Sequence, residues 1–98
     1  MPSYRVLLAV GSLHPGVRPD TLLPCAAASA AEHTTVEAND IMMVRGLPQL
    51  VVRFTGADDP FALGVGAAVE ATVAELAEVR GARVTRRDGG AWTLVGAV

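Results

Sequence analysis

Apolar and polar residues divide the chain into segments that alternate between strand-like and helix-like patterns. The first segment, Tyr4 to Val10, is short, rich in branched side chains and bounded by Pro2 and Gly11, which is typical of a β-strand. Its residues are apolar on both faces except for Arg5, which lies near the start of the segment. A strand that is apolar on both sides is expected near the middle of a sheet.

The next segment, from Leu22 to about Glu32, is rich in alanine and predicts a helix. Thr21 precedes it and is the expected N-cap. Pro24 then falls in the first turn, where its missing N–H removes no intrahelical hydrogen bond. The apolar stripe of this helix consists mostly of methyl groups, so we expect the helix to pack closely against a sheet.

The middle of the chain predicts a hairpin. Thr34 to Val44 and Leu50 to Thr55 read as two strands, and the five residues Arg45 to Gln49 between them include Gly and Pro, which suit a turn. These strands should therefore pair antiparallel. The second strand alternates regularly between apolar and polar residues, whereas Asn39-Asp40 interrupts the first, which indicates a bulge or an exposed edge.

A second helix is predicted to begin with Asp59 as N-cap and Pro60 at the first helical position. Apolar residues then recur at steps of three and four, and Gly81 is placed to end the helix with a left-handed cap. Gly64 and Gly66 each weaken the helix by up to about 1 kcal/mol. We therefore expect both to permit the close approach of a neighbouring backbone.

The last residues predict a terminal hairpin, with strands at Ala82 to Arg87 and Ala91 to Val95 joined by the turn Asp88-Gly89-Gly90. The resulting order of elements resembles the ferredoxin-like α/β plait, βαββαβ, with an extra C-terminal strand. The resemblance covers nearly the whole chain and implies an antiparallel sheet with two helices on one face, and residues 1–98 are expected to form a single α+β domain. It carries no signature motif, so it implies a fold and no activity.

Composition narrows the class of protein. The 98 residues are 51% apolar and 18% charged, which favours one globular domain over disorder, and the net charge of −2 argues against a nucleic-acid partner. No apolar run is long enough for a membrane span, and His14 to Asp20 interrupts any signal-peptide pattern, so a cytoplasmic location is expected. One cysteine and two histidines provide no zinc-ligand cluster, and we expect no metal or cofactor.

The open face of the predicted sheet carries the main functional hypothesis. If both helices cover one face, the other carries Leu7, Ala9, Val51 and one of the alternating sets Ile41/Met43 or Met42/Val44. Trp92 is expected to anchor the terminal hairpin or a contact between subunits. A large apolar patch is rarely left exposed on a monomer, and a two-fold pair is the commonest way to cover it. The sequence therefore predicts a homodimeric interaction or accessory module that buries its open sheet face against a second copy.

A second hypothesis places a small anionic ligand at the loop after the first strand. Ser12, His14 and Arg18 lie close to the start of the first helix, where unpaired N–H groups favour an anion. This arrangement resembles regulatory domains of the ACT type, which bind small effectors near the same loop. Gly11 and Gly16 have the spacing of a phosphate loop, but the Lys and Ser/Thr that such a loop needs are missing.

A third hypothesis is a cofactor-independent enzyme of the dimeric α/β-barrel type, which would use His14, Arg18 or Tyr4. The sequence supplies no convergent set of acid and base groups, so binding to itself, to a ligand or to another protein is favoured over catalysis. Cys25 is expected to pack as a small hydrophobe. The arginines between Arg80 and Arg87 are expected to cap a helix and face solvent, because RNA-binding sheets need exposed aromatic residues that this chain largely lacks.

Overall fold

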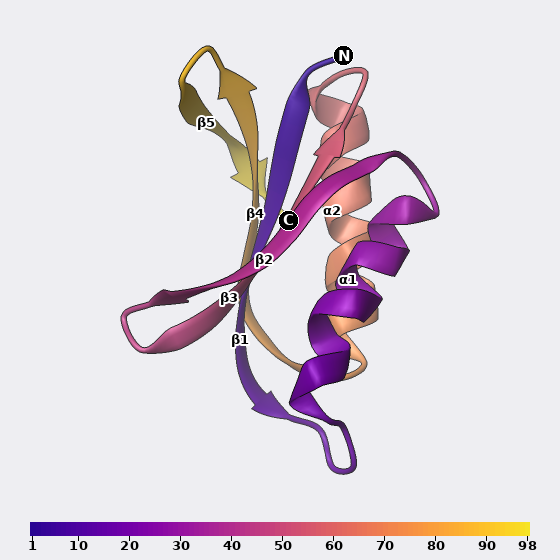
Figure 1. The fold of residues 1–98 in the computed structure, drawn as a ribbon, viewed down its shortest axis with the longest axis vertical. Coiled ribbons are helices and arrows are strands. Elements are labelled where there is room, and N and C mark those ends of the chain that lie inside the picture. The colour runs from indigo at the N-terminus through magenta and orange to yellow at the C-terminus, as the bar shows by residue number, and fades with distance from the viewer.

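The structure, a computed structural model, describes all of residues 1–98 (Figure 1). It contains five strands, two α-helices and one short 3-10 turn. In chain order the elements are β1 (Ser3–Leu13), η1 (Pro19–Thr21), α1 (Leu22–Ala31), β2 (Val36–Val44), β3 (Leu47–Thr55), α2 (Asp59–Ala74), β4 (Ala77–Asp88) and β5 (Ala91–Ala97).

The strands form one sheet in the order β2-β3-β1-β4-β5, and every neighbouring pair is antiparallel. The two helices contact each other and lie side by side along the sheet (Figure 1). Strand β1 takes the middle position, as its two apolar faces predicted. The hairpin of β2 and β3 extends away from the helices, so neither helix covers its tip (Figure 1).

The fold class predicted from the sequence, a ferredoxin-like βαββαβ plait, is wrong. The structure is a single antiparallel sheet of five strands with two helices, in the order given above, and strands make up 49% of the chain. The strands are longer than their local patterns indicated, because β1 and β3 run past the predicted bounds and β4 replaces the end of the predicted second helix. The predicted order of helices and strands along the chain does not determine how long each strand is or which strands pair.

The end of α2 shows how this difference arises. The sequence predicted a helix up to Gly81, but α2 ends at Ala74 and β4 begins two residues after Glu75. From Ala77 to Arg80, buried or half-buried apolar residues alternate with exposed charged ones, which is the period of a strand. Gly81 consequently lies inside β4, opposite Ala9 of β1, and caps no helix.

The helix starts also differ from the prediction. Asp58, not Asp59, is the N-cap of α2, and its carboxylate accepts a 2.9 Å hydrogen bond from the backbone N–H of Phe61. Asp59 is the first helical residue, which frees its side chain for other contacts. Thr21 precedes α1 as predicted, but its hydroxyl donates to the carbonyl of Arg18 at 2.7 Å and caps no helical N–H.

The turn between β2 and β3 is tighter than predicted. It consists of Arg45 and Gly46, which have φ angles of 52° and 79°. Positive φ at both central residues is the geometry of the two-residue turns that match the twist of paired strands. Because the turn is so short, β3 begins at Leu47 and the hairpin gains length beyond the rest of the sheet.

The core lies between the helices and one face of the sheet. Tyr4, Val6, Leu8 and Val10 of β1 are all at most 2% exposed, and they pack with apolar side chains from both helices. In α2, a Cβ added at Gly66 would lie 2.7 Å from Cγ2 of Val84, so the close approach there is made by side chains and not by the expected backbone. At Gly64 the expected close approach is wrong, because an added Cβ would meet open space.

Candidate functional site

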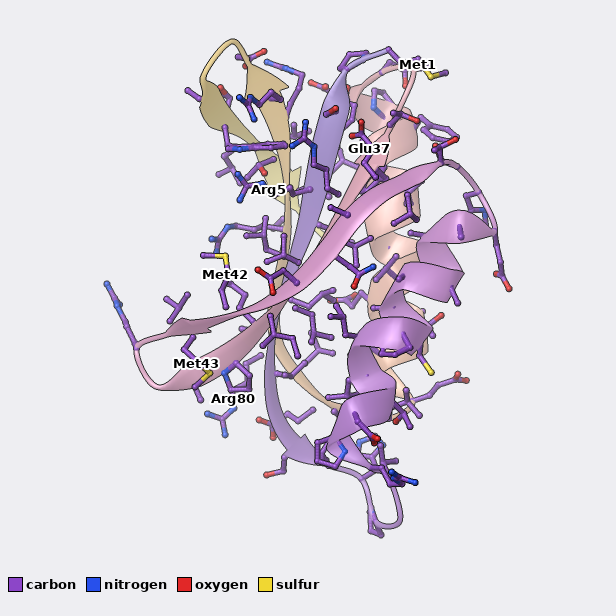
Figure 2. All side chains as sticks on the ribbon, viewed as in Figure 1. Met1, Arg5, Glu37, Met42, Met43 and Arg80 are labelled. Atoms are coloured by element: carbon purple, nitrogen blue, oxygen red, sulfur yellow. The ribbon has the colours of Figure 1, made fainter.

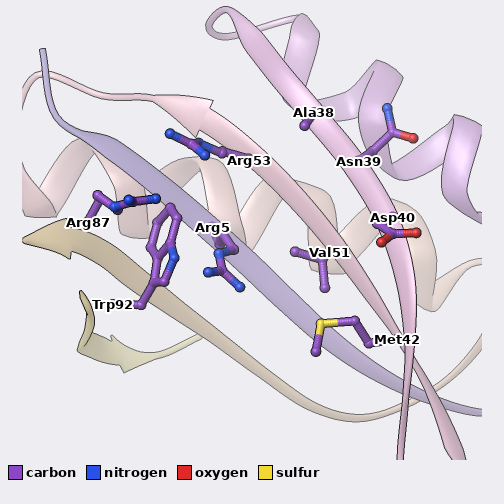
Figure 3. A pocket seen from close by; sticks show the side chains of 9 residues that line it. All are labelled: Arg5, Ala38, Asn39, Asp40, Met42, Val51, Arg53, Arg87 and Trp92. Carbon is purple, nitrogen blue, oxygen red and sulfur yellow. The ribbon is translucent and has the colours of Figure 1, made fainter. Parts of the chain in front are cut away.

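A pocket of about 220 Å³ lies on the open face of the sheet, which is the face opposite this core (Figure 3). All five strands contribute side chains to it, so it depends on the assembled sheet. We call it the arginine pocket. Its lining consists of Arg5, Ala38, Asn39, Asp40, Met42, Val51, Arg53, Arg87 and Trp92.

The register of the strands brings the cationic side chains of the arginine pocket together. Arg5 of β1 lies directly across from Arg53 of β3, and Arg87 of β4 lies directly across from Trp92 of β5. Residues opposite each other on antiparallel strands point to the same face and lie about 5 Å apart. The sheet therefore holds guanidinium groups from three adjacent strands on a single face.

Trp92 stands between Arg87 and Arg5 (Figure 3). The guanidinium carbons of Arg5, Arg53 and Arg87 lie 3.8, 5.3 and 5.5 Å from the centre of the indole ring. Each cation–π contact contributes about 0.5–1 kcal/mol at an exposed site. That gain is similar to the cost of like charges on facing strand positions, so stacking holds the cluster together without neutralising it.

The charges of the cluster are only partly balanced. Arg53 pairs with Glu37, with Nε and Oε1 3.3 Å apart, whereas Arg5 and Arg87 form no ion pair. Arg87 instead donates to the carbonyl of Gly89 at 2.7 Å. Burial, together with the nearby charges of Arg53 and Arg87, lowers the pKa of Arg5. The pocket therefore carries more positive charge than its neighbouring carboxylates offset.

The rest of the lining of the arginine pocket is not cationic. Val51 and Met42 supply apolar surface, and Asp40 lies across the pocket from the arginines. The carboxylate of Asp40 accepts a 2.8 Å hydrogen bond from the backbone N–H of Ile41. Arginine side chains donate hydrogen bonds and do not give up their protons in proteins. The arrangement is thus suited to binding a ligand that accepts hydrogen bonds and has an apolar part.

The residues predicted to form a dimer interface lie on the open face, but they offer little free area. Leu7 and Val51 are only 6% and 7% exposed in the single chain, and Ala9 is half-buried. Trp92 is also half-buried and stacks with the arginines. A partner on this face would therefore contact mainly charged side chains, because the apolar residues there are already largely buried within the single chain.

The predicted loop site is not assembled in the structure. Nδ1 of His14 lies 3.0 Å from the carbonyl of Glu75, and Arg18 pairs with Asp20 at 3.0 Å while both side chains remain mostly exposed. Ser12 is exposed near the end of β1. A second pocket of about 200 Å³ opens beside this loop, but none of the three predicted residues lines it, and its surface is almost entirely apolar.

The other residues considered for chemistry lie apart from the arginine pocket. Tyr4 points into the core, where it is 1% exposed and donates a hydrogen bond to Asp59. Cys25 is half-buried on α1 and forms no disulfide. No group of three or more His, Cys, Asp or Glu side chains is arranged to hold a metal ion. These positions do not converge into a catalytic arrangement.

Sequence reasoning did not identify Arg5, Arg53 and Arg87 as a site. The local pattern places Arg5 at the end of the first strand and Arg87 in the terminal hairpin, and it singles out neither for binding. The available signal was one arginine in β1, one in β3 and four in β4, of which Arg87 lines the pocket. Only the register, which places Arg5 opposite Arg53, reveals that these positions share a face and a neighbourhood.

Comparison with known protein families, characterised proteins and solved structures finds no match to this chain. The structure itself adds one restriction, since neither helix is both long enough and apolar enough to cross a bilayer. The functional argument therefore rests on the geometry and charge of the arginine pocket and on the exposed surface of the sheet.

Proposed function

We propose that this chain binds a small organic anion in the arginine pocket. The observation that carries the proposal is the facing pair Arg5 and Arg53, with Arg87 close by and only Glu37 as a paired carboxylate. Like charges at facing strand positions destabilise a sheet. An anion between these guanidinium groups would remove that repulsion, and charge-assisted hydrogen bonds would hold it.

The walls of the pocket indicate the class of ligand. A guanidinium group forms two parallel hydrogen bonds with a carboxylate or a phosphate, so either group fits the cationic wall. The indole of Trp92 and the side chain of Met42 offer apolar surface for the rest of the molecule. The volume of about 220 Å³ is small for a ligand site, which limits the ligand to roughly one ring or a short chain.

This proposal keeps the small-anion hypothesis drawn from the sequence and moves its site from the loop to the sheet. The loop residue Arg18 already has Asp20 as a partner, whereas Arg5 has no carboxylate partner. The enzyme hypothesis stays a prediction, and no contact described above favours it. The homodimer hypothesis also stays a prediction, and a surface other than the open sheet face supports it.

The pocket contains its own reporter, because Trp92 is the single tryptophan of the chain. Phenylacetate and inorganic phosphate should each be titrated into the protein while its tryptophan fluorescence is recorded. We expect a saturable change, with phenylacetate binding more tightly because it also covers apolar surface. The affinity should fall as ionic strength rises, since salt screens the guanidinium charges. If neither anion produced a saturable change in the tryptophan fluorescence, the proposal would be refuted.

Matched arginine variants locate the site. Arg87→Gln should weaken binding about tenfold or more, because hydrogen bonds to charged groups contribute about 1.5–3 kcal/mol. Arg83→Gln is the control, since Arg83 is an exposed arginine of the same strand that does not line the pocket. Arg18→Ala tests the loop. Loss of binding in Arg18→Ala with normal binding in Arg87→Gln would return the site to the loop.

A further inference from the structure

The tip of the β2–β3 hairpin, residues 41–47, carries most of the exposed large apolar side chains of the protein. Met43 is 67% exposed, and Ile41, Met42, Val44 and Leu47 are each between 36% and 46% exposed. Met42 and Met43 stand on opposite sides of the hairpin, which extends away from the helices (Figure 2). Contiguous exposed apolar surface of this kind marks a contact site more often than chance exposure does.

The same segment is an unprotected sheet edge. Strand β2 ends the sheet, so one side of its backbone has no partner strand. Natural edge strands are usually shielded by charges, prolines or bulges. Residues Ile41 to Val44 include neither a charge nor a proline, and the one register shift in β2 lies farther back, between Val36 and Ala38.

Charges at the two ends of this edge indicate which partner fits it. Asp40 precedes the apolar segment and Arg45 follows it, and neither forms an ion pair within the chain. If two copies paired antiparallel through this segment, Asp40 of each would approach Arg45 of the other, and the contact would occur twice. A parallel pairing would bring like charges together instead.

We propose that two copies of this chain associate through β2, antiparallel about a two-fold axis, and join their sheets at this edge. The methionines and Ile41 of the two hairpin tips then pack against each other on both sides of the joined sheet. An isologous contact of this kind is closed, so assembly stops at the dimer and forms no filament. This interface differs from the open-face interface expected from the sequence, and it does not depend on anion binding.

The mass of the full chain in solution tests the proposal. Light scattering coupled to size-exclusion chromatography should give twice the 10.1 kDa of the single chain. Met43→Lys should give the single-chain mass, because it places a charge at the exposed centre of the interface. Leu94→Lys is the matched control. Leu94 is 63% exposed on the other edge strand, so this variant should remain dimeric.

A charge exchange tests the orientation of the pair. Asp40→Arg and Arg45→Asp should each raise the dissociation constant of the dimer about fivefold or more, and the double variant should restore it. A wild-type protein with only the single-chain mass would overturn the proposal, as would a Met43→Lys variant that stays dimeric. Arg87→Gln should leave the mass unchanged, so failure of the dimer and failure of anion binding are distinguishable.

Discussion

The phenol of Tyr4 donates a 2.8 Å hydrogen bond to Oδ1 of Asp59 and so joins the central strand β1 to the first turn of α2. Arg86 of β4 donates to Oδ2 of the same carboxylate at 2.7 Å and to both oxygens of Asp88 at 3.1 Å. Desolvation and the contact with Asp59 raise the pKa of Tyr4 to about 12. Hydrogen bonds from Tyr4 and then Arg86 lower the pKa of Asp59.

Removing the hydroxyl should measure this contact. Tyr4→Phe keeps the buried ring but leaves one carboxylate oxygen without its donor, so we expect the free energy of unfolding to fall by about 1 kcal/mol. Urea denaturation measures the change. The double variant Tyr4→Phe, Asp59→Asn should lose less than the sum of the single variants, since the two residues share one contact. Strict additivity would show that the hydrogen bond contributes nothing.

Alkaline pH should weaken the fold through the same residue. The neutral phenol is favoured in the native state, so its contribution is complete below the ordinary pKa of 10.0 and is lost as pH rises toward about 12. Tyr4 is the single tyrosine of the chain, so absorbance of the phenolate follows this one group. The native protein should titrate near pH 12, and the urea-unfolded chain near pH 10. Equal midpoints in the two states would contradict the prediction.

Acid should weaken the fold through the carboxylates. Hydrogen bonds from Arg86 and then Thr93 lower the pKa of Asp88, and the pKa of Asp59 is lowered as described above. Their contribution is therefore present above the ordinary pKa of about 4 and is lost as pH falls through the lower native values. Melting temperatures should decline below about pH 4. Asp59→Asn should flatten this decline, whereas Asp20→Asn, on the exposed turn η1, should leave it unchanged.

Two glycines of α2 should respond to alanine in opposite ways. Gly66→Ala places a methyl group 2.7 Å from Cγ2 of Val84, and this overpacking should cost about 1–3 kcal/mol. Gly64→Ala meets open space, so the gain in helix propensity should stabilise the protein by about 1 kcal/mol. Thermal unfolding of both variants checks the pair. Destabilisation by both would mean that the surface at Gly64 is also in close contact.

Anion should stabilise the fold only when the arginine pocket is intact. Arg5→Met removes both the charge that faces Arg53 and the cation–π contact with Trp92, and because these two effects are similar in size we expect the stability without anion to change by less than about 1 kcal/mol. Phosphate should raise the melting temperature of the wild-type protein because it binds the native state. The same phosphate should have no effect on Arg5→Met. An equal rise in the melting temperature of the variant would contradict this account.

Local sequence signals predicted several elements well because their physical causes are local. The two apolar faces of β1 predicted its central place, and the alanine-rich segment predicted a helix that α1 matches from Leu22 to Ala31. The end of α2 was mispredicted because residues near Leu76 and Val79 fit a helical stripe as well as an alternating strand. Pairing with β1 decides between the two, and that contact is distant in sequence.

The candidate site was harder to predict than the elements. Arg5 and Arg87 lie on strands at opposite ends of the chain, and a register slip of one residue would send either side chain to the other face. The sequence predicts a site in the loop containing His14 and Arg18 because its polar residues are close together in the sequence. In the structure those residues are occupied by contacts with Glu75 and Asp20.

The cations of the arginine pocket come from neighbouring strands of one sheet, at facing or nearly facing positions. Backbone hydrogen bonds fix the spacing of these strands, and stacking on Trp92 keeps the guanidinium groups near one another despite their repulsion. The binding geometry is thus preorganised before a ligand arrives. An incoming anion should lose little entropy through ordering of the protein, and its association should proceed without a slow conformational step.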